Sequence, residues 1–257
     1  MKSRIQYQTE AIVLRSLDYG ESDKIVTFYT IDYGKVKGIA KGARRSQKRF
    51  ANTLEMLSCL QLLFSRRHPE GLAFIEEGTV INHYAGIRSD LKKTLYASYM
   101  ADITDQFTLE HKTNPALFRL LGDFLELFDL GSVSEDLVRF FEMRLLKLVG
   151  YEPVLDRCVK CREPLQNSAM YHFNVREGGL QCGICFPRDY DYLGVSTGTV
   201  KSMLLGKELE REKLSRLVLP EQCARESRLF LERFIAHLLG KEVKSLHVIR
   251  EIRELGI

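Results

Sequence analysis

Two short motifs decide the fold in the middle of the chain: Cys158-Val159-Lys160-Cys161 and, after twenty intervening residues, Cys182-Gly183-Ile184-Cys185. Each Cys-x2-Cys pair forms a tight knuckle, and the segment between them returns the second pair to the first, so four thiols can surround one tetrahedral zinc ion. The sequence therefore predicts one structural zinc, ligated by Cys158, Cys161, Cys182 and Cys185. Four protein ligands leave no open position for a catalytic water, so the motif itself predicts no reaction.

The segment before these cysteines is predicted to be a small β-barrel. Five runs rich in Ile, Val, Leu, Phe and Tyr alternate with turn sequences such as Asp18-Tyr19-Gly20 and Asp32-Tyr33-Gly34. The predicted strands are residues 8–17, 24–30, 34–40, 56–64 and 72–80. Five strands in the first eighty residues fit a barrel of the OB type, although an SH3-like barrel would give the same pattern.

After residue 82 the hydrophobic period becomes helical. Asp90, Asn114-Pro115 and Ser134 are start signals for three helices, and a further clear helix opens at Pro220 and ends before Gly240. The predicted fold is α+β and multidomain, an N-terminal OB-fold barrel followed by a helical domain with an inserted zinc module. We predict an OB domain over residues 1–82, helices over 83–150, the zinc module over 151–189 and further helices over 190–257.

The sequence predicts a cytoplasmic protein. The N-terminus has no apolar signal sequence, and no uninterrupted apolar run reaches the length of a membrane helix. A reducing compartment favours cysteine pairs as metal ligands over disulfides.

The positive charge lies in the N-terminal part of the chain. Residues 1–80 contain thirteen Lys and Arg against nine Asp and Glu, which accounts for the whole net charge of +4, because residues 81–257 hold twenty-five of each.

The N-terminal excess of charge is concentrated in one segment between Tyr33 and Leu54. Its seven cations have no acidic residue among them: Lys35, Lys37, Lys41, Arg44, Arg45, Lys48 and Arg49. A one-signed run of this kind on a barrel suits the phosphate backbone of a nucleic acid, where counterion release supplies affinity without reading sequence. The alternative is a solvated face. The flanking Phe28, Tyr29, Tyr33 and Phe50 can stack on bases, but aromatic residues in strands more often belong to the core.

A catalytic centre is not predicted. Gly194-Val195-Ser196-Thr197-Gly198 matches the nucleophile elbow of hydrolases, yet the remaining sequence lacks the large parallel sheet that the motif needs, so Ser196 is interpreted as a helix N-cap. His172, between the cysteine pairs, is expected to be a bystander or to support the ligands. A metal-dependent nuclease would need three convergent carboxylates, and Glu76-Glu77 is an isolated acidic pair.

The sequence resembles the RecO family of bacterial recombination mediators along nearly its whole length. The resemblance rests on residues 10–14, on Tyr19-Gly20-Glu21-Ser22-Asp23-Lys24, on Gly34 and on Ile39-Ala40-Lys41-Gly42-Ala43-Arg44-Arg45. In the central region it rests on Gly150-Tyr151-Glu152-Pro153, on the cysteine pairs and on Gly178-Gly179. The segment from Ala40 to Arg45 is its most specific part.

The resemblance implies a DNA-binding repair protein without enzymatic turnover. It implies binding to single- and double-stranded DNA, annealing of complementary strands and, together with RecR, loading of RecA onto DNA coated by single-strand binding protein (SSB). A rival hypothesis is a zinc-containing RNA-binding or transcription-associated factor that uses the same basic barrel.

A receptor for the acidic, aromatic-ended tail of SSB is expected within residues 83–150, with the C-terminal helices packed on it. The candidate residues are apolar, Phe118, Leu121, Phe140, Phe141 and Leu145, and basic, Arg119, Arg139, Arg144 and Lys147. For each apolar residue, the alternative is a place in the core.

Overall fold

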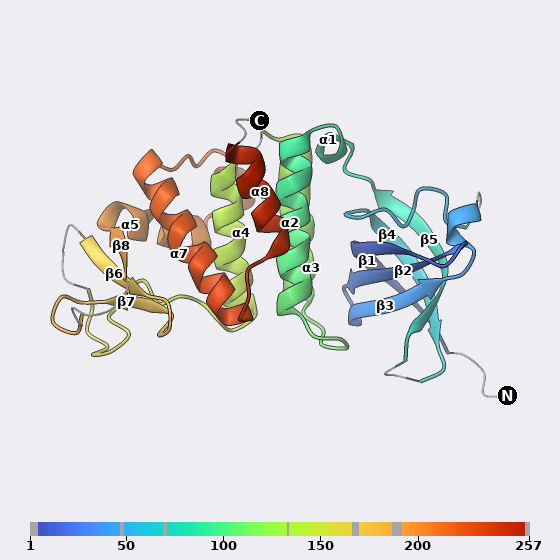
Figure 1. Ribbon diagram of the computed structural model, residues 1–257, viewed down its shortest axis with the longest axis horizontal. Helices are drawn as coiled ribbons and strands as arrows, with labels where there is room; N and C mark the ends of the chain where they lie inside the picture. Colours follow the sequence, from blue (N-terminus) through green and yellow to red (C-terminus); the bar gives the residue numbers. More distant parts are fainter. Residues whose placement is uncertain are drawn as a thin grey trace. The chain divides into compact units, whose positions relative to one another are not determined.

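A computed structural model describes residues 5–46, 49–68, 71–132, 134–165, 170–186 and 192–254 of the chain (Figure 1). The chain divides into two compact units, residues 1–130 and 131–257, which are described separately. The domain boundaries expected at residues 82, 150 and 189 stay predictions. No helix within the described ranges is both long enough and apolar enough to span a bilayer.

The first compact unit begins with a closed five-stranded barrel. Its strands are β1 (Ile5–Tyr19), β2 (Asp23–Thr30), β3 (Gly34–Ala40), β4 (Cys59–Arg66) and β5 (Ala73–Asn82). They close in the order β1-β2-β3-β5-β4, with all neighbours antiparallel except β3 and β5, which pair in parallel. All five predicted strands are present, and the predicted N-terminal barrel of the OB type is confirmed.

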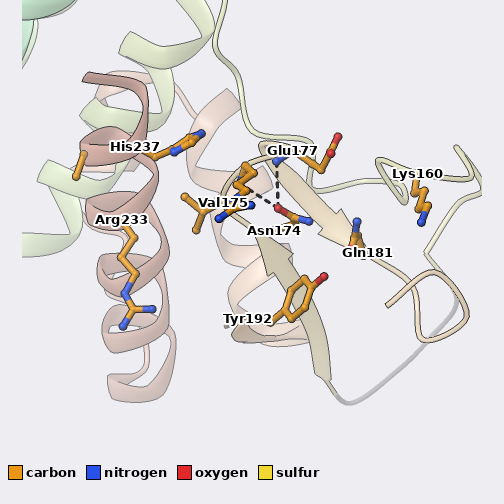
Figure 2. Close-up of a pocket in the computed structure, with 10 residues that line it drawn as sticks. Lys160, Asn174, Val175, Glu177, Gln181, Tyr192, Arg233 and His237 are labelled. Atoms are coloured by element: carbon orange, nitrogen blue, oxygen red, sulfur yellow. Dashed lines mark hydrogen bonds between the residues drawn. The ribbon is translucent and has the colours of Figure 1, made fainter. Parts of the chain in front are cut away.

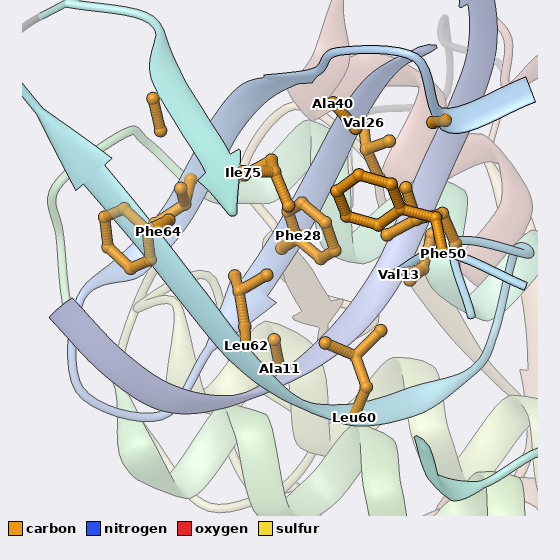
Figure 3. Close-up of a cluster of buried hydrophobic side chains, with 14 residues drawn as sticks. Ala11, Val13, Val26, Phe28, Ala40, Phe50, Leu60, Leu62, Phe64 and Ile75 are labelled. Atoms are coloured by element: carbon orange, nitrogen blue, oxygen red, sulfur yellow. The ribbon is translucent and has the colours of Figure 1, made fainter. Parts of the chain in front are cut away.

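Alternation along the strands fills the barrel with apolar side chains, among them Phe28, Phe64 and Leu62 (Figure 3). Burial of one such side chain stabilises the fold by about 1.5–3 kcal/mol. Gly38 in β3 leaves room for Ile75, because a Cβ at position 38 would lie 2.4 Å from the Cδ1 atom of Ile75 and would push that side chain aside. The aromatic residues Phe28, Tyr29 and Phe50 are all buried, so the interpretation of these three as core is confirmed.

Three helices complete the first compact unit: α1 (Ala85–Arg88), α2 (Leu91–Phe107) and α3 (Pro115–Leu130). The predicted caps are present, because Asp90 Oδ1 accepts the Lys93 N–H at 3.0 Å and Asn114 Oδ1 accepts the Leu117 N–H at 3.1 Å. The α2 helix is anchored to the barrel by Asp105, which lies 3.0 Å from Lys35 Nζ and 3.3 Å from Arg15 Nη2.

The second compact unit contains α4 (Glu135–Leu148), α5 (Thr197–Glu208), α6 (Arg211–Leu214), α7 (Glu221–Leu239) and α8 (Lys244–Glu254). Ser134 and Ser196 cap α4 and α5 as predicted, and α7 occupies the span predicted between Pro220 and Gly240. The α4 and α7 helices also share a buried ionic contact, in which Arg139 lies 3.1 Å from Glu142 and 3.8 Å from Glu232.

A three-stranded antiparallel sheet packs on α7 within this unit. Its strands are β6 (Met170–Asn174), β7 (Gly179–Gln181) and β8 (Leu193–Ser196), in the order β7-β6-β8. Phe173 of β6 lies 4.9 Å from Phe230 and 5.6 Å from Phe234, measured between ring centroids. The sequence does not predict this sheet, because its strands are too short to show an alternation with a period of two. The sheet joins the cysteine module to the helices.

Candidate nucleic-acid interface and metal centre

The basic segment begins in β3 and turns where that strand leaves the barrel. Lys35 and Lys37 lie at alternate positions of β3, and Lys41 follows the strand directly. Gly42 has φ 67°, a left-handed conformation that glycine adopts without strain, and it starts a short 3₁₀ turn over Ala43–Arg45. The turn leaves Arg44 and Arg45 exposed while Ala43 enters the core.

Carboxylates from the β1–β2 turn lie against these cations. Asp18 is 3.2 Å from Arg44, Glu21 is 3.8 Å from Arg45, and Asp23 is 2.7 Å from Lys41. The segment has no acid of its own, as the sequence shows, but in the folded chain part of its charge is compensated by acids from elsewhere. The β2–β3 pairing sets Lys24 opposite Ala40 and so places the β1–β2 turn, with its acids, beside the end of β3, an arrangement that a linear charge run does not reveal.

Asp23 holds the turn of the basic segment in place. Its Oδ1 accepts the Gly42 N–H at 2.9 Å and the Ser22 hydroxyl at 3.0 Å, while Lys41 donates to Oδ2. The hydrogen bond from Gly42, together with that from Lys41, lowers the pKa of the Asp23 carboxyl from 3.8 to about 2. The carboxylate is therefore charged at neutral pH and orders the turn that presents Arg44 and Arg45.

The remaining predicted DNA-binding residues have different surroundings. Lys35 is only 15% exposed and pairs with Asp105 of α2, so its ammonium group is engaged in packing a helix on the barrel. Lys37 is exposed and has no ion pair among the described residues. Arg49 donates to the Lys41 carbonyl at 3.1 Å and lies over the Phe50 ring. Lys48 lies outside the described residues.

The four cysteines of the central motifs form one cluster. Their sulfur atoms all lie within 4.8 Å of one another, and Cys161 Sγ is 3.8 Å from Cys182 Sγ. Tetrahedral zinc with Zn–S bonds of about 2.3 Å separates its sulfur ligands by about 3.8 Å. The cluster has the ligand number, chemistry and spacing to hold one metal ion.

Backbone geometry prepares this cluster for a cation. Burial raises the pKa of Cys158, but N–H groups of Cys161, Cys182 and Lys160 directed at its sulfur lower it to about 6. The neighbouring Cys182 side chain raises the pKa of Cys185 to about 12. Four crowded thiols therefore cannot all ionise by themselves, and a divalent cation supplies the charge that lets them do so.

Tight backbone contacts hold the two cysteine knuckles together. The Val159 N–H donates to the Leu180 carbonyl at 2.9 Å, and Val154 exchanges hydrogen bonds with Gly178 and Leu180. A Cβ on Gly179 would lie 2.3 Å from Val159 Cγ1, so only glycine permits this approach. His172 is stacked on Phe186 with ring centroids 3.8 Å apart and is not part of the cluster.

Ser196 is a structural cap. Its hydroxyl oxygen accepts the Thr199 N–H at 3.3 Å and donates to Glu226 at 2.7 Å. The strand before it belongs to a three-stranded antiparallel sheet, which differs from the large parallel sheet of a hydrolase elbow. The interpretation of Ser196 as an N-cap is confirmed.

The candidate receptor residues for an SSB tail are mostly buried. Phe118, Leu121, Phe140, Phe141 and Leu145 are at most 6% exposed. Arg139 is buried beside Glu142, Arg144 donates to the carbonyls of Gly206 and Leu209, and Lys147 pairs with Glu208 at 3.0 Å. Arg119 is exposed. The five apolar residues belong to hydrophobic cores, which was the alternative stated for each of them. The location of an SSB receptor within residues 83–150 stays a prediction.

Comparison with protein families shows the class of protein to which the chain belongs. A family model described as "Recombination protein O N terminal" matches residues 1–84, the barrel, and one described as "Recombination protein O C terminal" matches residues 88–247. The class is therefore a recombination protein with an N-terminal barrel and a helical region that carries the cysteine cluster.

The chain belongs to the RecO family of DNA repair proteins. The DNA repair protein RecO of Syntrophus aciditrophicus is 49% identical to it, with all of both chains covered. The corresponding protein of Geobacter metallireducens is 35% identical over 95% of this chain and 97% of its own, and that of Bacillus pumilus is 31% identical over 96% and 95%. The resemblance inferred from the sequence is thus confirmed.

Proposed function

We propose that this protein is a cytoplasmic recombination mediator that binds single- and double-stranded DNA and anneals complementary strands without catalytic turnover. Together with RecR, it helps to load RecA onto SSB-coated single-stranded DNA during repair. The observation that carries the DNA-binding part is the gathering of Lys41, Arg44, Arg45 and Arg49 where β3 leaves the barrel, on a chain of the RecO family. Lys37 extends this charge along β3.

Phosphate binding explains how such a surface promotes annealing. Two DNA strands repel each other, and cations that accompany both strands screen that repulsion. Arginine can hold a phosphate with two hydrogen bonds, while lysine acts as a point charge. Because these contacts reach the backbone and not base edges, sequence preference is expected to be low.

Zinc is the metal that we propose for the cysteine cluster. Four thiolates in two Cys-x2-Cys pairs are typical of structural zinc, and their sulfurs leave no position for a substrate. The ion would hold the two knuckles together and stabilise the sheet that packs on α7. Its role in DNA repair is then to fold this part of the chain.

The partner proteins follow from the family and are the least direct part of the proposal. We expect the acidic SSB tail to bind within residues 83–150 and the helices packed on them, with Arg119 as an exposed basic candidate. Titration calorimetry with a peptide of the host's SSB tail should show binding that weakens with salt. Equal binding by a peptide without the terminal Phe would contradict recognition of the aromatic end, and equal binding by the isolated first eighty residues would contradict the placement.

A salt-controlled binding comparison tests the central proposal. Affinities for single-stranded DNA, duplex DNA and RNA of one sequence are measured over a range of salt concentrations, and annealing of complementary DNA strands is followed in the same buffers. We expect both DNA forms to bind with steep salt dependence and annealing to be faster than without protein. A strong preference for structured RNA without annealing would favour an RNA-binding factor instead.

A further inference from the structure

A concavity lined by basic residues lies in residues 131–257, between the β6–β7 turn, the cysteine module and α7 (Figure 2). Its volume is about 810 Å³, which is in the range of small-molecule sites. Nothing in the proposed role of the barrel uses it.

Cations from three separate segments line this concavity. Lys160 comes from the first cysteine knuckle, Arg176 from the β6–β7 turn and Arg233 from α7, and all three are exposed. His237 lies one turn beyond Arg233, and Glu177 is the acid among the lining residues. The excess of positive charge fits an anionic ligand.

Two further residues narrow the chemistry of that ligand. Gln181 is 3% exposed, and its Oε1 accepts no hydrogen bond among the described residues. Such an acceptor calls for a donor from elsewhere. Tyr192 adds an aromatic ring to the same wall, and Figure 2 shows Gln181 and Tyr192 on the side of the sheet, across from Arg233 and His237 on α7.

The apolar side chains of the lining are Val175, Ala236 and Tyr192, so the concavity offers the face of one ring and two small side chains. An acidic peptide with an aromatic end would need a deeper apolar cavity. One nucleotide, in contrast, combines an aromatic base, N–H donors on the base edge and a phosphate, and so matches the ring, the amide oxygen and the cations.

We propose that this concavity binds one unstacked nucleotide of single-stranded DNA. The base stacks on Tyr192 and donates an N–H to Gln181 Oε1, and the adjacent phosphates lie among Lys160, Arg176 and Arg233. All four bases carry an N–H donor, so the site takes any base. The inference rests on the proposed DNA-binding function and adds a second DNA site, in the other compact unit, so that one chain holds two strands.

Photo-crosslinking tests the contact with Tyr192 directly. The full-length chain, prepared with zinc, is irradiated with single-stranded DNA that contains 5-iododeoxyuridine, and crosslinked peptides are identified by mass spectrometry. We expect a crosslink to Tyr192 in the native chain and also in the Arg44→Glu/Arg45→Glu variant of the barrel. Crosslinks confined to the barrel in the native chain would overturn the inference.

Charge reversal supplies an independent readout. We expect Arg233→Glu to weaken binding of an oligothymidylate about fivefold or more and to flatten its salt slope by about 0.7, the value for one phosphate contact with a single strand. Arg225→Glu is the matched control, because Arg225 is exposed on the same helix and does not line the concavity. Circular dichroism and zinc content check that both variants fold.

The outcomes separate this inference from the proposed function. If the barrel variant loses affinity while Arg233→Glu behaves like Arg225→Glu, the proposed function stands and the second site is wrong. If neither the barrel variant nor Arg233→Glu changes DNA binding, both proposals fail. If Arg233→Glu abolishes binding of an SSB-tail peptide and leaves DNA binding intact, the occupant is a peptide and the inference is overturned.

Discussion

The cysteine cluster was inferred from residue spacing and the basic segment from a run of like charges, and the two behave differently in the folded chain. All four cysteines come together within 4.8 Å, as their spacing predicted. The cations have different surroundings. Lys35 pairs with Asp105 of α2, and Lys37 is exposed. Acids of the β1–β2 turn pair with Lys41, Arg44 and Arg45. A metal site fixes the geometry of its ligands, whereas a charge run leaves each side chain to find its own partner.

Disruption of the cysteine cluster is expected to have the largest effect. Freshly prepared protein should contain about one zinc per chain, and Cys158→Ser should lose it, because a serine oxygen cannot replace a thiolate ligand. Binding of structural zinc contributes about 10–16 kcal/mol in small zinc domains. Elemental analysis after dialysis, with limited proteolysis of the module, gives the measurement.

A cysteine outside the cluster provides the control for this experiment. Cys59 lies on β4, and burial raises the pKa of its thiol to about 11, so it is not expected to bind metal. Cys59→Ala should therefore keep the zinc. Less than about half an equivalent of metal in native protein with reduced thiols would contradict the proposal.

Charge reversal in the basic segment is expected to have the next largest effect. Arg44→Glu/Arg45→Glu should weaken DNA binding for all sequences and flatten the salt slope by about one to two units, because each lost phosphate contact removes about 0.7–0.9. Fluorescence anisotropy over a salt series measures both quantities. Lys201→Glu/Arg225→Glu makes the same change of charge at exposed helix positions, and an equal effect of the two double variants would rule out a specific site.

Two lysines of one strand sharpen the comparison. Lys35→Ala should lower the free energy of unfolding by about 1–2 kcal/mol, because it removes a hydrogen-bonded partner from the part-buried Asp105. Lys37→Ala should leave unfolding unchanged and flatten the salt slope of DNA binding by about 0.7–0.9. Urea denaturation and binding titrations separate these effects. The opposite result, in which Lys35→Ala weakens DNA binding and Lys37→Ala lowers the free energy of unfolding, would contradict the contacts described for the two side chains.

The smallest expected effect concerns the acid that holds the basic turn. The pKa of Asp23 is lowered to about 2, so its stabilising contribution is complete above the ordinary value of 3.8 and is lost as the pH falls toward 2. Asp23→Asn should lack this component of the acid dependence, while Glu55→Gln, at an exposed position, should keep it. Thermal midpoints compared across this pH range test the prediction, and identical curves for native protein and Asp23→Asn would contradict it.

Local signals predicted most of the fold. Caps such as Asp90, Ser134 and Ser196 act within three residues of themselves, and strand alternation is a property of consecutive residues, so both can be recognised in the sequence. The cysteine ligands could be recognised for the same reason, because the metal needs two short knuckles. The sheet of β6, β7 and β8 was missed because its strands, at three to five residues, carry too little alternation.

The surroundings of the cations could not be predicted from the sequence. Asp105 is seventy residues from Lys35, and their contact depends on how α2 packs on the barrel. Gln181, Tyr192 and Arg233 share one concavity only because the cysteine module folds back against α7. No sequence motif connects these residues. The one sequence signal is the position of Gln181 directly before the second cysteine pair.

The acids of the β1–β2 turn also bear on how long DNA stays bound. A phosphate that reaches Arg44 or Arg45 has to displace Asp18 or Glu21, which remain tethered nearby at high effective concentration. If DNA binds here as proposed, the returning carboxylates compete with the phosphate and shorten the residence time of the protein on any one stretch of DNA. The proposed annealing function requires release of the finished duplex, and these carboxylates would speed that release.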